Sequence, residues 1–466
     1  MSVSRSLICR LERICGLESV LSDPDELLVY ESDAYPLARG LPGGVVFPTS
    51  TEATSQVVQA LHDHGVAFVP RGSGTSLAGG CLTPSDAVMV CTSKMKRILE
   101  VDLDNECAIV EAGVITQEIS DAVAEYGYFY APDPASQSTC TIGGNVATNA
   151  GGPHTLKYGV TGHHVLGLTV VLPRGEVLPL GGRTQTAHGY DLDSVFVGSE
   201  GTLGLVTEVT VKLTRTPAAY RTVLAIYDCM DDAGNTVRDI IAAGIVPAAL
   251  EMMDQAIVQI LEDAYAYGFP CDAEAVLVIE LDGIEAGLDR QLDRILTICR
   301  ENHVRSVENA ASAEQRAALW KARKTAFGAL GRAAPTCITQ DGVVPRSELP
   351  HILRFVRQVA DKHHLRVASN FHAGDGNIHP NFLFDQRDPR QVEAVQQASH
   401  EILAECVRVG GSVTGEHGIG VEKTEALKLM FNEADLAAQR RVKHVFDPAG
   451  KANPNKIFVP RAQTNA

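Results

Sequence analysis

The chain has 466 residues, of which 45% are hydrophobic and 21% are charged. This length exceeds one ordinary hydrophobic core, so two or three folded units are expected, and the composition excludes a disordered chain. The formal net charge of −17 argues against binding to nucleic acid or to an anionic membrane surface. An anionic substrate would therefore need local positive charge from Arg, Lys or a metal.

The 11 cysteines are scattered and contain no Cys-x-x-Cys pair. This pattern favours a reducing compartment over a disulfide framework, and it argues against an iron–sulfur cluster or structural zinc. No apolar run approaches the roughly 18–20 residues that span a bilayer. We therefore expect a cytoplasmic protein that begins with an amphipathic helix and not with a signal peptide.

Short strand-like segments and glycine-rich turns alternate from about residue 40 to residue 215. Strands are expected at 45–48, 67–70, 87–90 and 166–172. A helix is expected from Thr51 to His64, with Thr51 as its cap and Gly65 as its end. These alternations predict an α+β domain.

The character of the chain changes after Pro217. A strand is expected at 275–281, and charged helices are expected at 288–300, 314–327 and 434–445. A second α+β domain is the simplest interpretation. The predicted domains are residues 1–217, residues 218–424, and a C-terminal segment 425–466 that returns to the first domain.

A loop of small residues at 70–80 directly follows a predicted strand. Its glycines allow consecutive backbone N–H groups to point into one concavity, as in sites that hold a diphosphate. The spacing differs from the dinucleotide-binding G-x-G-x-x-G motif, because position 77 is Leu, and no Gly-Lys-Ser/Thr of a P-loop follows. On this loop alone, a tight surface turn remains an alternative.

Two further segments of small residues occur at 132–152 and 198–211. Three such segments in one domain indicate a long ligand that lies against backbone. Together they resemble the FAD-binding domain of the vanillyl-alcohol oxidase/p-cresol methylhydroxylase superfamily. The resemblance implies a two-part FAD-binding domain. Some members attach FAD covalently through His or Cys; His154 and Cys140 lie near the second segment, but we expect non-covalent binding.

The resemblance also implies the residues that contact FAD. At the diphosphate these are Pro70, Arg71, Gly72, Ser73, Gly74 and Thr75. Along the flavin channel they are Pro132, Asp133, Ser138, Gly143, Gly144, Ala147 and Gly152. Near the other end of the channel they are Glu200, Gly204 and Val206, and Asn453 belongs to a closing motif that returns to the FAD domain.

The stretch 371–379, Phe-His-Ala-Gly-Asp-Gly-Asn-Ile-His, carries two histidines that flank a glycine-rich bend. Six residues separate His372 from His379, and the bend allows both rings to turn toward one point. Glu416 and His417 follow as a pair between two glycines. Two His and one carboxylate form an open metal site, and the remaining His can move a proton.

The second half of the chain resembles the C-terminal domain of FAD-linked 2-hydroxyacid dehydrogenases. These include the D-type subunit of glycolate oxidase, D-lactate dehydrogenases and D-2-hydroxyglutarate dehydrogenase, and over its full length the chain is most similar to the first. The resemblance implies that His372, His379 and Glu416 hold a divalent metal (Zn, Mn or Fe) and that His417 is the base.

A reaction follows from these expectations. Arg323 offers a planar guanidinium for the substrate carboxylate. The metal acidifies the 2-hydroxyl, His417 removes its proton, and hydride passes to flavin N5. Asn381 is expected to orient the substrate or a metal-bound water. Asp375 is expected to form the turn, with a role as partner of a ligand histidine as the alternative.

The expected substrate is a small 2-hydroxy acid, glycolate or D-lactate. Related 2-hydroxyglutarate enzymes bind a second carboxylate at positions that correspond to Phe327 and Thr339, so diacid oxidation is the alternative. A non-catalytic flavin relay subunit is a further alternative. The resemblance implies a second FAD-type subunit and an iron–sulfur subunit of a glycolate oxidase complex as partners, with peripheral attachment to the inner membrane through them.

Overall fold

The computed structural model describes residues 3–184 and 189–458. Residue contacts divide the chain into two compact units. Unit 1 contains the chain up to Gly151, Val160–Thr216 and the segment from Glu416 onward, and unit 2 contains Gly152–Gly159 and Pro217–Gly415. The domains 1–217, 218–424 and 425–466 remain our proposal for the functional division.

Unit 1 contains two principal sheets. The first has four strands in the order β1-β2-β4-β3, in which β2, β4 and β3 run parallel and β1 is antiparallel to β2. The second has five antiparallel strands in the order β5-β6-β10-β8-β9. A two-stranded sheet joins β11 to β7. The loop 72–80 leaves the end of β3.

The elements of unit 1 have the following bounds. The strands are β1 Val20–Leu21, β2 Val45–Val46, β3 Ala67–Arg71, β4 Ala87–Cys91, β5 Ile98–Asp102, β6 Cys107–Glu111, β7 Tyr128–Phe129, β8 Val165–Val171, β9 Val177–Gly181, β10 Leu205–Lys212 and β11 Thr214–Arg215. The helices are α1 Arg5–Cys15, α2 Pro24–Leu27, α3 Thr51–Asp63, α4 Thr116–Val123, α5 Ile142–Thr148, α7 Leu192–Phe196, α14 Leu427–Met430 and α15 Glu433–Phe446.

Helices α1 and α3 bury their apolar faces in the core of the first sheet. Leu7 and Leu11 of α1 are fully buried there together with Leu61 of α3, which confirms the expected amphipathic N-terminal helix. The predicted cap of α3 was wrong by one residue. Ser50 is the cap, because its hydroxyl accepts from Ala53 N at 3.2 Å, whereas Thr51 is the first helical residue and donates to Thr207 Oγ1 at 3.0 Å.

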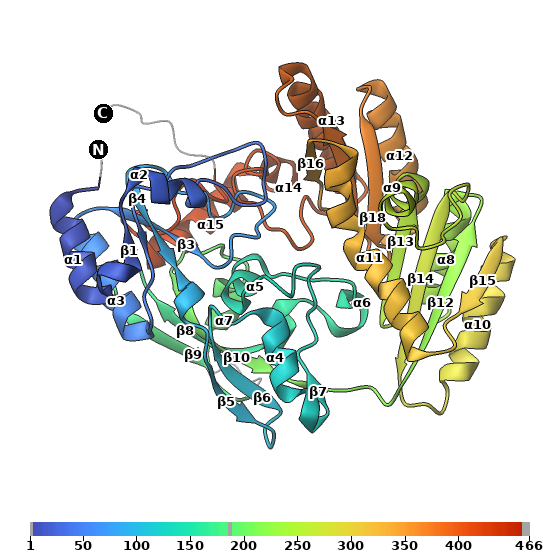
Figure 1. Ribbon diagram of the computed structural model, residues 1–466, viewed down its shortest axis with the longest axis horizontal. Coiled ribbons are helices and arrows are strands. Elements are labelled where there is room, and N and C mark those ends of the chain that lie inside the picture. Colours follow the sequence, from blue (N-terminus) through green and yellow to red (C-terminus); the bar gives the residue numbers. More distant parts are fainter. Residues whose placement is uncertain (1–2, 185–188, 459–466) are drawn as a thin grey trace. The chain divides into compact units, whose positions relative to one another are not determined.

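Unit 2 is built on one antiparallel sheet of eight strands. The strand order is β15-β12-β14-β13-β18-β19-β16, and β17 also pairs with β19. Helices α9 and α11 cover one face (Figure 1), where their apolar residues share a core with β12, β13, β14, β18 and β19. Helices α8, α10, α12 and α13 pack against one another and against the sheet.

The elements of unit 2 have the following bounds. The strands are β12 Ala219–Tyr227, β13 Ala249–Asp254, β14 Ala275–Gly283, β15 Ser306–Asn309, β16 Thr336–Thr339, β17 Gly342–Val343, β18 Arg366–His372 and β19 Asn377–Phe384. The helices are α6 Thr155–Tyr158, α8 Met230–Ala242, α9 Gln255–Tyr265, α10 Leu288–Glu301, α11 Ala313–Ala333, α12 Leu349–Lys362 and α13 Pro389–Arg408.

The α+β architecture and the antiparallel sheet of the second unit confirm the predicted fold class. The predicted strands at 67–70, 87–90, 166–172 and 275–281 correspond to β3, β4, β8 and β14, and the predicted helix at 288–300 corresponds to α10. Among the residues that the structure describes, no helix is both long and apolar enough to cross a membrane.

Candidate active site and cofactor loops

The hairpin of β18 and β19 brings His372 and His379 together. His372 pairs across the strands with Asn377, so residues 373–376 form the turn, and His379 lies opposite Asn370. Because residues two apart in a strand share a face, both rings project from the same face of the sheet. The ring centroids are 4.9 Å apart at an interplanar angle of 89°, and both side chains are buried. The predicted convergence of these two rings is confirmed.

Both histidines are fixed through their Nδ1 atoms. His372 Nδ1 lies 2.8 Å from Glu251 Oε1, and His379 Nδ1 lies 3.1 Å from the carbonyl oxygen of Gln340. A carboxylate and a backbone carbonyl only accept, so each Nδ1 carries a proton and donates. The neutral ring then has Nε2 as its ligand atom, which is the usual arrangement of a metal-binding histidine.

Glu251 also forms an ion pair with Arg323 of α11. Arg323 Nη2 lies 2.6 Å from Glu251 Oε2, and both side chains are buried. Burial alone would raise the pKa of Glu251, but the hydrogen bond from His372 and the charge of Arg323 outweigh it, and the pKa is lowered. Arg323 Nε is buried without an acceptor among the described residues. A carboxylate bound beside this guanidinium would supply the negative charge that such a donor favours.

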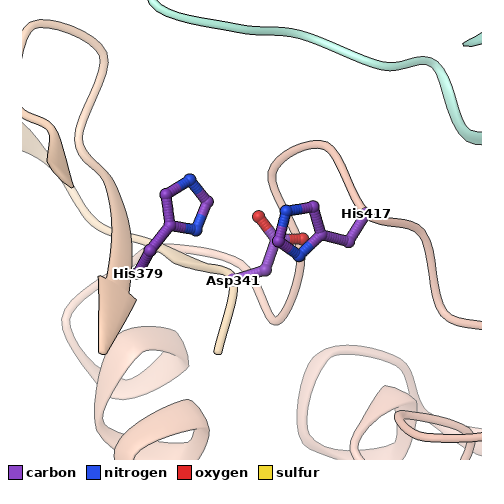
Figure 2. A group of neighbouring side chains, drawn as sticks. All are labelled: Asp341, His379 and His417. Carbon is purple, nitrogen blue, oxygen red and sulfur yellow. The ribbon is translucent and has the colours of Figure 1, made fainter. Parts of the chain in front are cut away.

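Glu416 and His417 directly follow Gly415, the last residue of unit 2. Two groups of possible metal ligands have their ligand atoms within 4.8 Å of one another: His372, His379 and Glu416, and Asp341, His379 and His417. Figure 2 shows the second group, with His379 on strand β19 and His417 on a loop. The predicted ligand set is therefore one of two overlapping groups that share His379.

Asp341 is buried in the link between β16 and β17. Its carboxylate accepts from Thr414 Oγ1 at 2.6 Å and from Gly415 N at 3.1 Å. These bonds hold the residues that immediately precede Glu416. Asp341, Gln340 and the contacts of Glu251 were not predicted from the sequence; the adjacent polar residues Gln340 and Asp341 were the available signal.

The side chains of Asn381 and Asp375 form hydrogen bonds with nearby residues of unit 2. Asn381 is fully buried; its oxygen accepts from Thr339 Oγ1 at 2.7 Å, and its amide nitrogen donates to the carbonyl of Ala368 at 2.8 Å. Asp375 Oδ1 accepts from Asn377 N at 3.0 Å, which is the bond of a turn-forming Asp. These bonds support the expected turn role of Asp375, while a substrate contact of Asn381 stays a prediction.

The loop after β3 has the features of an anion cradle. Residues 71–77 are half-buried. The backbone N–H groups of residues 73–77 donate no hydrogen bond to any residue that the structure describes. Consecutive N–H groups without an internal acceptor fit the FAD diphosphate. The side chain of Arg71 is otherwise engaged: its Nη1 donates to the carbonyl of Ser32 at 2.9 Å, and its guanidinium lies over the ring of Tyr30.

The three small-residue segments meet within unit 1. A Cβ at Gly72 would overlap Thr141 Oγ1, and a Cβ at Gly201 would lie 2.7 Å from Pro70 Cγ. Asn453 completes the junction, because its amide nitrogen donates to the carbonyls of Gly80 at 3.0 Å and Glu200 at 2.6 Å. Each of these glycines thus leaves room for a side chain from a distant segment.

Glu200 lies inside this junction and holds the loop that carries His417. Its carboxylate is buried and accepts from Ile419 N at 2.7 Å and Gly420 N at 2.8 Å. Burial raises the pKa of Glu200, which these two donors partly offset. A contact of Glu200 with FAD stays a prediction, and the carboxylate also holds the backbone of Ile419 and Gly420.

The remaining predicted cofactor residues lie in or next to the second and third segments. Pro132, Asp133 and Ser138 lie in the loop before α5, and Gly143, Gly144 and Ala147 lie in α5. Gly204 immediately precedes β10, and Val206 is its second residue. Gly152 belongs to unit 2 with the short segment that contains His154. The ring of His154 lies 5.1 Å from that of Trp320, and its Nε2 lies 3.5 Å from Glu280 Oε1.

Curated relatives resemble this chain over almost its whole length. Glycolate oxidase subunit GlcD of Bacillus subtilis (strain 168) is 41% identical over 455 residues, which are 97% of each chain. GlcD of Escherichia coli (strain K12) is 42% identical over 97% of this chain and 90% of its own. The mitochondrial D-lactate dehydrogenase (cytochrome) of Arabidopsis thaliana is 30% identical over 98% of this chain and 81% of its own.

A solved structure of p-cresol methylhydroxylase with substrate bound has a TM-score of 0.84 at 16% identity, covers 98% of each chain, and confirms the predicted fold type. Residues 42–181 match the FAD binding domain, and residues 216–457 match the C-terminal domain of FAD linked oxidases. The second match spans more than half of the chain, and the relatives extend it to nearly the full length. The chain therefore belongs to the family of FAD-linked oxidases.

Proposed function

We propose that this protein oxidises a small 2-hydroxy acid, glycolate or D-lactate, to the 2-oxo acid with FAD as its cofactor. The observation that carries the proposal is the arrangement around Glu251, which fixes a histidine of the metal group and a buried arginine on one face of one sheet. A metal beside a guanidinium is suited to a substrate that carries a hydroxyl next to a carboxylate. The names of the relatives give the two substrates.

The donor set fits a divalent metal. His372 and His379 each have Nδ1 fixed, and Glu416 supplies a carboxylate within 4.8 Å of their ligand atoms. Two imidazoles and one carboxylate accommodate zinc, manganese or iron. When bound, the metal supplies Lewis acidity toward the 2-hydroxyl group.

The loop of residues 73–77 fits the diphosphate of FAD through its backbone N–H groups. Attachment is non-covalent in our proposal. Cys140 is buried, and burial raises the pKa of its thiol, which disfavours the reactive thiolate. His154 packs on Trp320 beside Glu280. When bound, FAD accepts the hydride that leaves the substrate Cα, at flavin N5.

The residues of the chain bind the substrate and move its proton. Arg323 binds the carboxylate through its guanidinium, with Asn381 as a candidate for orienting the substrate. His417 takes the hydroxyl proton as the Cα–H bond breaks, so the C–O single bond becomes the carbonyl of the 2-oxo acid. A neutral imidazole suits this step near pH 7.

A monoacid is favoured over a diacid by two side chains. Phe327 is an apolar residue one helical turn after Arg323, and Thr339 already donates to Asn381. Neither provides a cation for a second carboxylate. As in the relatives that are named subunits, we propose partner subunits, a second FAD-type subunit and an iron–sulfur subunit, through which the protein is peripheral to the inner membrane.

The test is anaerobic reduction of bound FAD by glycolate and by D-lactate, followed as loss of flavin absorbance. In His417→Ala, the substrate should reduce the flavin about 10²- to 10⁴-fold more slowly than in the parent, because this is the usual contribution of general base catalysis. His400→Ala on the exposed surface of α13 is the matched control and should keep the parent rate. Reduction of His417→Ala at the parent rate would refute the assignment of the base.

A further inference from the structure

We propose that Glu251 is a positioning residue that makes metal binding and substrate binding depend on one carboxylate. Its Oε1 holds the metal ligand His372, and its Oε2 holds the guanidinium of Arg323. The inference rests on the proposed function for the roles of His372 and Arg323. It adds the residue that couples them.

The sheet register fixes Glu251 at this junction. Glu251 of β13 is the direct cross-strand partner of His372 in β18. Direct partners share a face of the sheet, and Met253, two residues after Glu251, packs in the core under α9 and α11. Glu251 therefore projects toward α11, where Arg323 lies, and its side chain is completely buried. The Glu251 carboxylate therefore contacts both His372 and Arg323 at a position from which water is excluded.

The first contact controls the metal ligand. A carboxylate that accepts from Nδ1 selects the tautomer with Nε2 as the ligand atom, fixes the ring orientation and raises the basicity of Nε2. His379 obtains the same tautomer from a backbone carbonyl, which carries no charge. Substitution of Glu251 therefore weakens one of the two histidine ligands and leaves the other intact.

The second contact controls the guanidinium. Arg323 is buried, so it requires a counter-charge, and Glu251 lies 2.6 Å away. Loss of that charge leaves a buried cation without compensation, and such a side chain leaves its position. A displacement of about 1 Å in a group that positions substrate can cost about 100-fold in rate.

Glu280 provides a matched comparison in the same sheet. It is also a completely buried glutamate, on the neighbouring strand β14, and it accepts from Arg316 Nε at 2.7 Å and Trp320 Nε1 at 2.7 Å. Its ion-pair partner is thus a different arginine of α11. Glu280→Gln therefore reports the general consequence of neutralising a buried, paired carboxylate in unit 2.

The experiment measures metal affinity without substrate and catalysis at saturating metal. Mn²⁺ and, separately, Zn²⁺ are titrated calorimetrically into FAD-loaded protein, and kcat/KM for glycolate is then measured with the metal in excess. Glu251→Gln should lose about 10- to 100-fold in metal affinity and on the order of tenfold or more in kcat/KM. Glu280→Gln should keep the parent metal affinity.

Two further variants separate coupling from a general loss of structure. Glu251→Asp keeps the charge with a shorter reach, so its losses should lie between those of the parent and Glu251→Gln; it also serves as the test if Glu251→Gln does not fold. Arg323→Gln should keep the parent metal affinity while kcat/KM falls.

Parent values of metal affinity and kcat/KM in folded Glu251→Gln would overturn the inference, as would equal losses of metal affinity in Glu251→Gln and Glu280→Gln. A parent protein that binds neither metal and is reduced by neither glycolate nor D-lactate would instead overturn the proposed function and the inference together.

Discussion

One hairpin of unit 2 brings His372 and His379 together, whereas the cofactor loops of unit 1 meet through contacts between segments as much as 373 residues apart. In the hairpin, strand register alone decides that both rings share a face. In unit 1, the junction needs glycines for close approach and the buried amide of Asn453 as a bridge.

This difference separates two ways of making a functional site. The histidine pair depends on main-chain pairing of a sheet with a large core, so its geometry should tolerate changes elsewhere in the chain. The cofactor loops depend on a few side chains that bridge otherwise separate segments. Damage to the histidine pair should therefore leave the cofactor loops intact, and variants of either site test this contrast.

The largest effect is expected for His379→Ala. Removal of one of three metal ligands should abolish metal retention and lower turnover by about 10³-fold or more, because Lewis-acid stabilisation is worth several kcal/mol. The FAD content, measured by flavin absorbance, should stay at the parent value, since the cofactor loops belong to unit 1.

His363→Ala is the control for this variant. His363 is a partly buried histidine of unit 2 that bonds to Glu401 at 2.9 Å and lies in neither metal group. It should keep metal and turnover. Parent metal content in His379→Ala, or loss of FAD together with the metal, would contradict the independence of the two sites.

A second prediction concerns charge within strand β13, where Glu251 and Asp254 are both buried. His372 and Arg323 lower the pKa of Glu251, whereas burial raises the pKa of Asp254 from 3.8 to about 6 despite backbone donors. The folded state therefore binds the proton of Asp254 more tightly than the unfolded chain does. The resulting stability is fully present below about pH 4 and is lost as pH rises through 6, by about 3 kcal/mol.

Asp254→Asn removes this titration. Between pH 4 and pH 7, the free energy of unfolding of the variant should rise by about 2 kcal/mol relative to that of the parent, as measured by urea unfolding at a series of pH values. Asp385→Asn is the control, since hydrogen bonds from Arg387 hold the pKa of Asp385 at about 2 and its difference should be flat over this range. A flat difference for Asp254→Asn would show that Asp254 is ionised in the folded state.

The sequence predicted what local pattern controls. The stretch 371–379 predicted the convergence of two histidines because its bend lies between two strand segments, and the hairpin confirms it. Helix α10 was predicted within one residue. The cap of α3 was misassigned because Ser and Thr are both good capping residues. The hydrogen bonds distinguish them, since Thr51 donates to the distant Thr207 whereas Ser50 accepts from the backbone of Ala53.

The sequence could not predict contacts that depend on sheet register or on side-chain direction. Glu251 is 121 residues from His372, and nothing in either local pattern specifies that β13 pairs with β18. Arg71 illustrates the second limit. The loop position predicted a contact of Arg71 with the diphosphate, and that contact stays a prediction. The direction of its guanidinium, which donates to the carbonyl of Ser32, could not be predicted from the loop pattern.

The smallest effect is expected for Asn453→Ala. The variant removes the donors to the carbonyls of Gly80 and Glu200 in a buried site, which should lower the free energy of unfolding of unit 1 by about 2 kcal/mol, or about 1 kcal/mol for each hydrogen bond. FAD affinity should fall with it, because this junction joins the first and third cofactor segments, while metal affinity should not change.

Asn455→Ala is the matched control for backbone strain. Asn453 and Asn455 both have positive φ, at 38° and 64°, so alanine is disfavoured at either position. Asn455, however, is exposed and bridges no cofactor segments. An FAD loss specific to Asn453→Ala would therefore report the bridge, whereas equal losses would report strain in the closing motif. Loss of metal affinity in Asn453→Ala would mean that the cofactor junction also supports the histidine site.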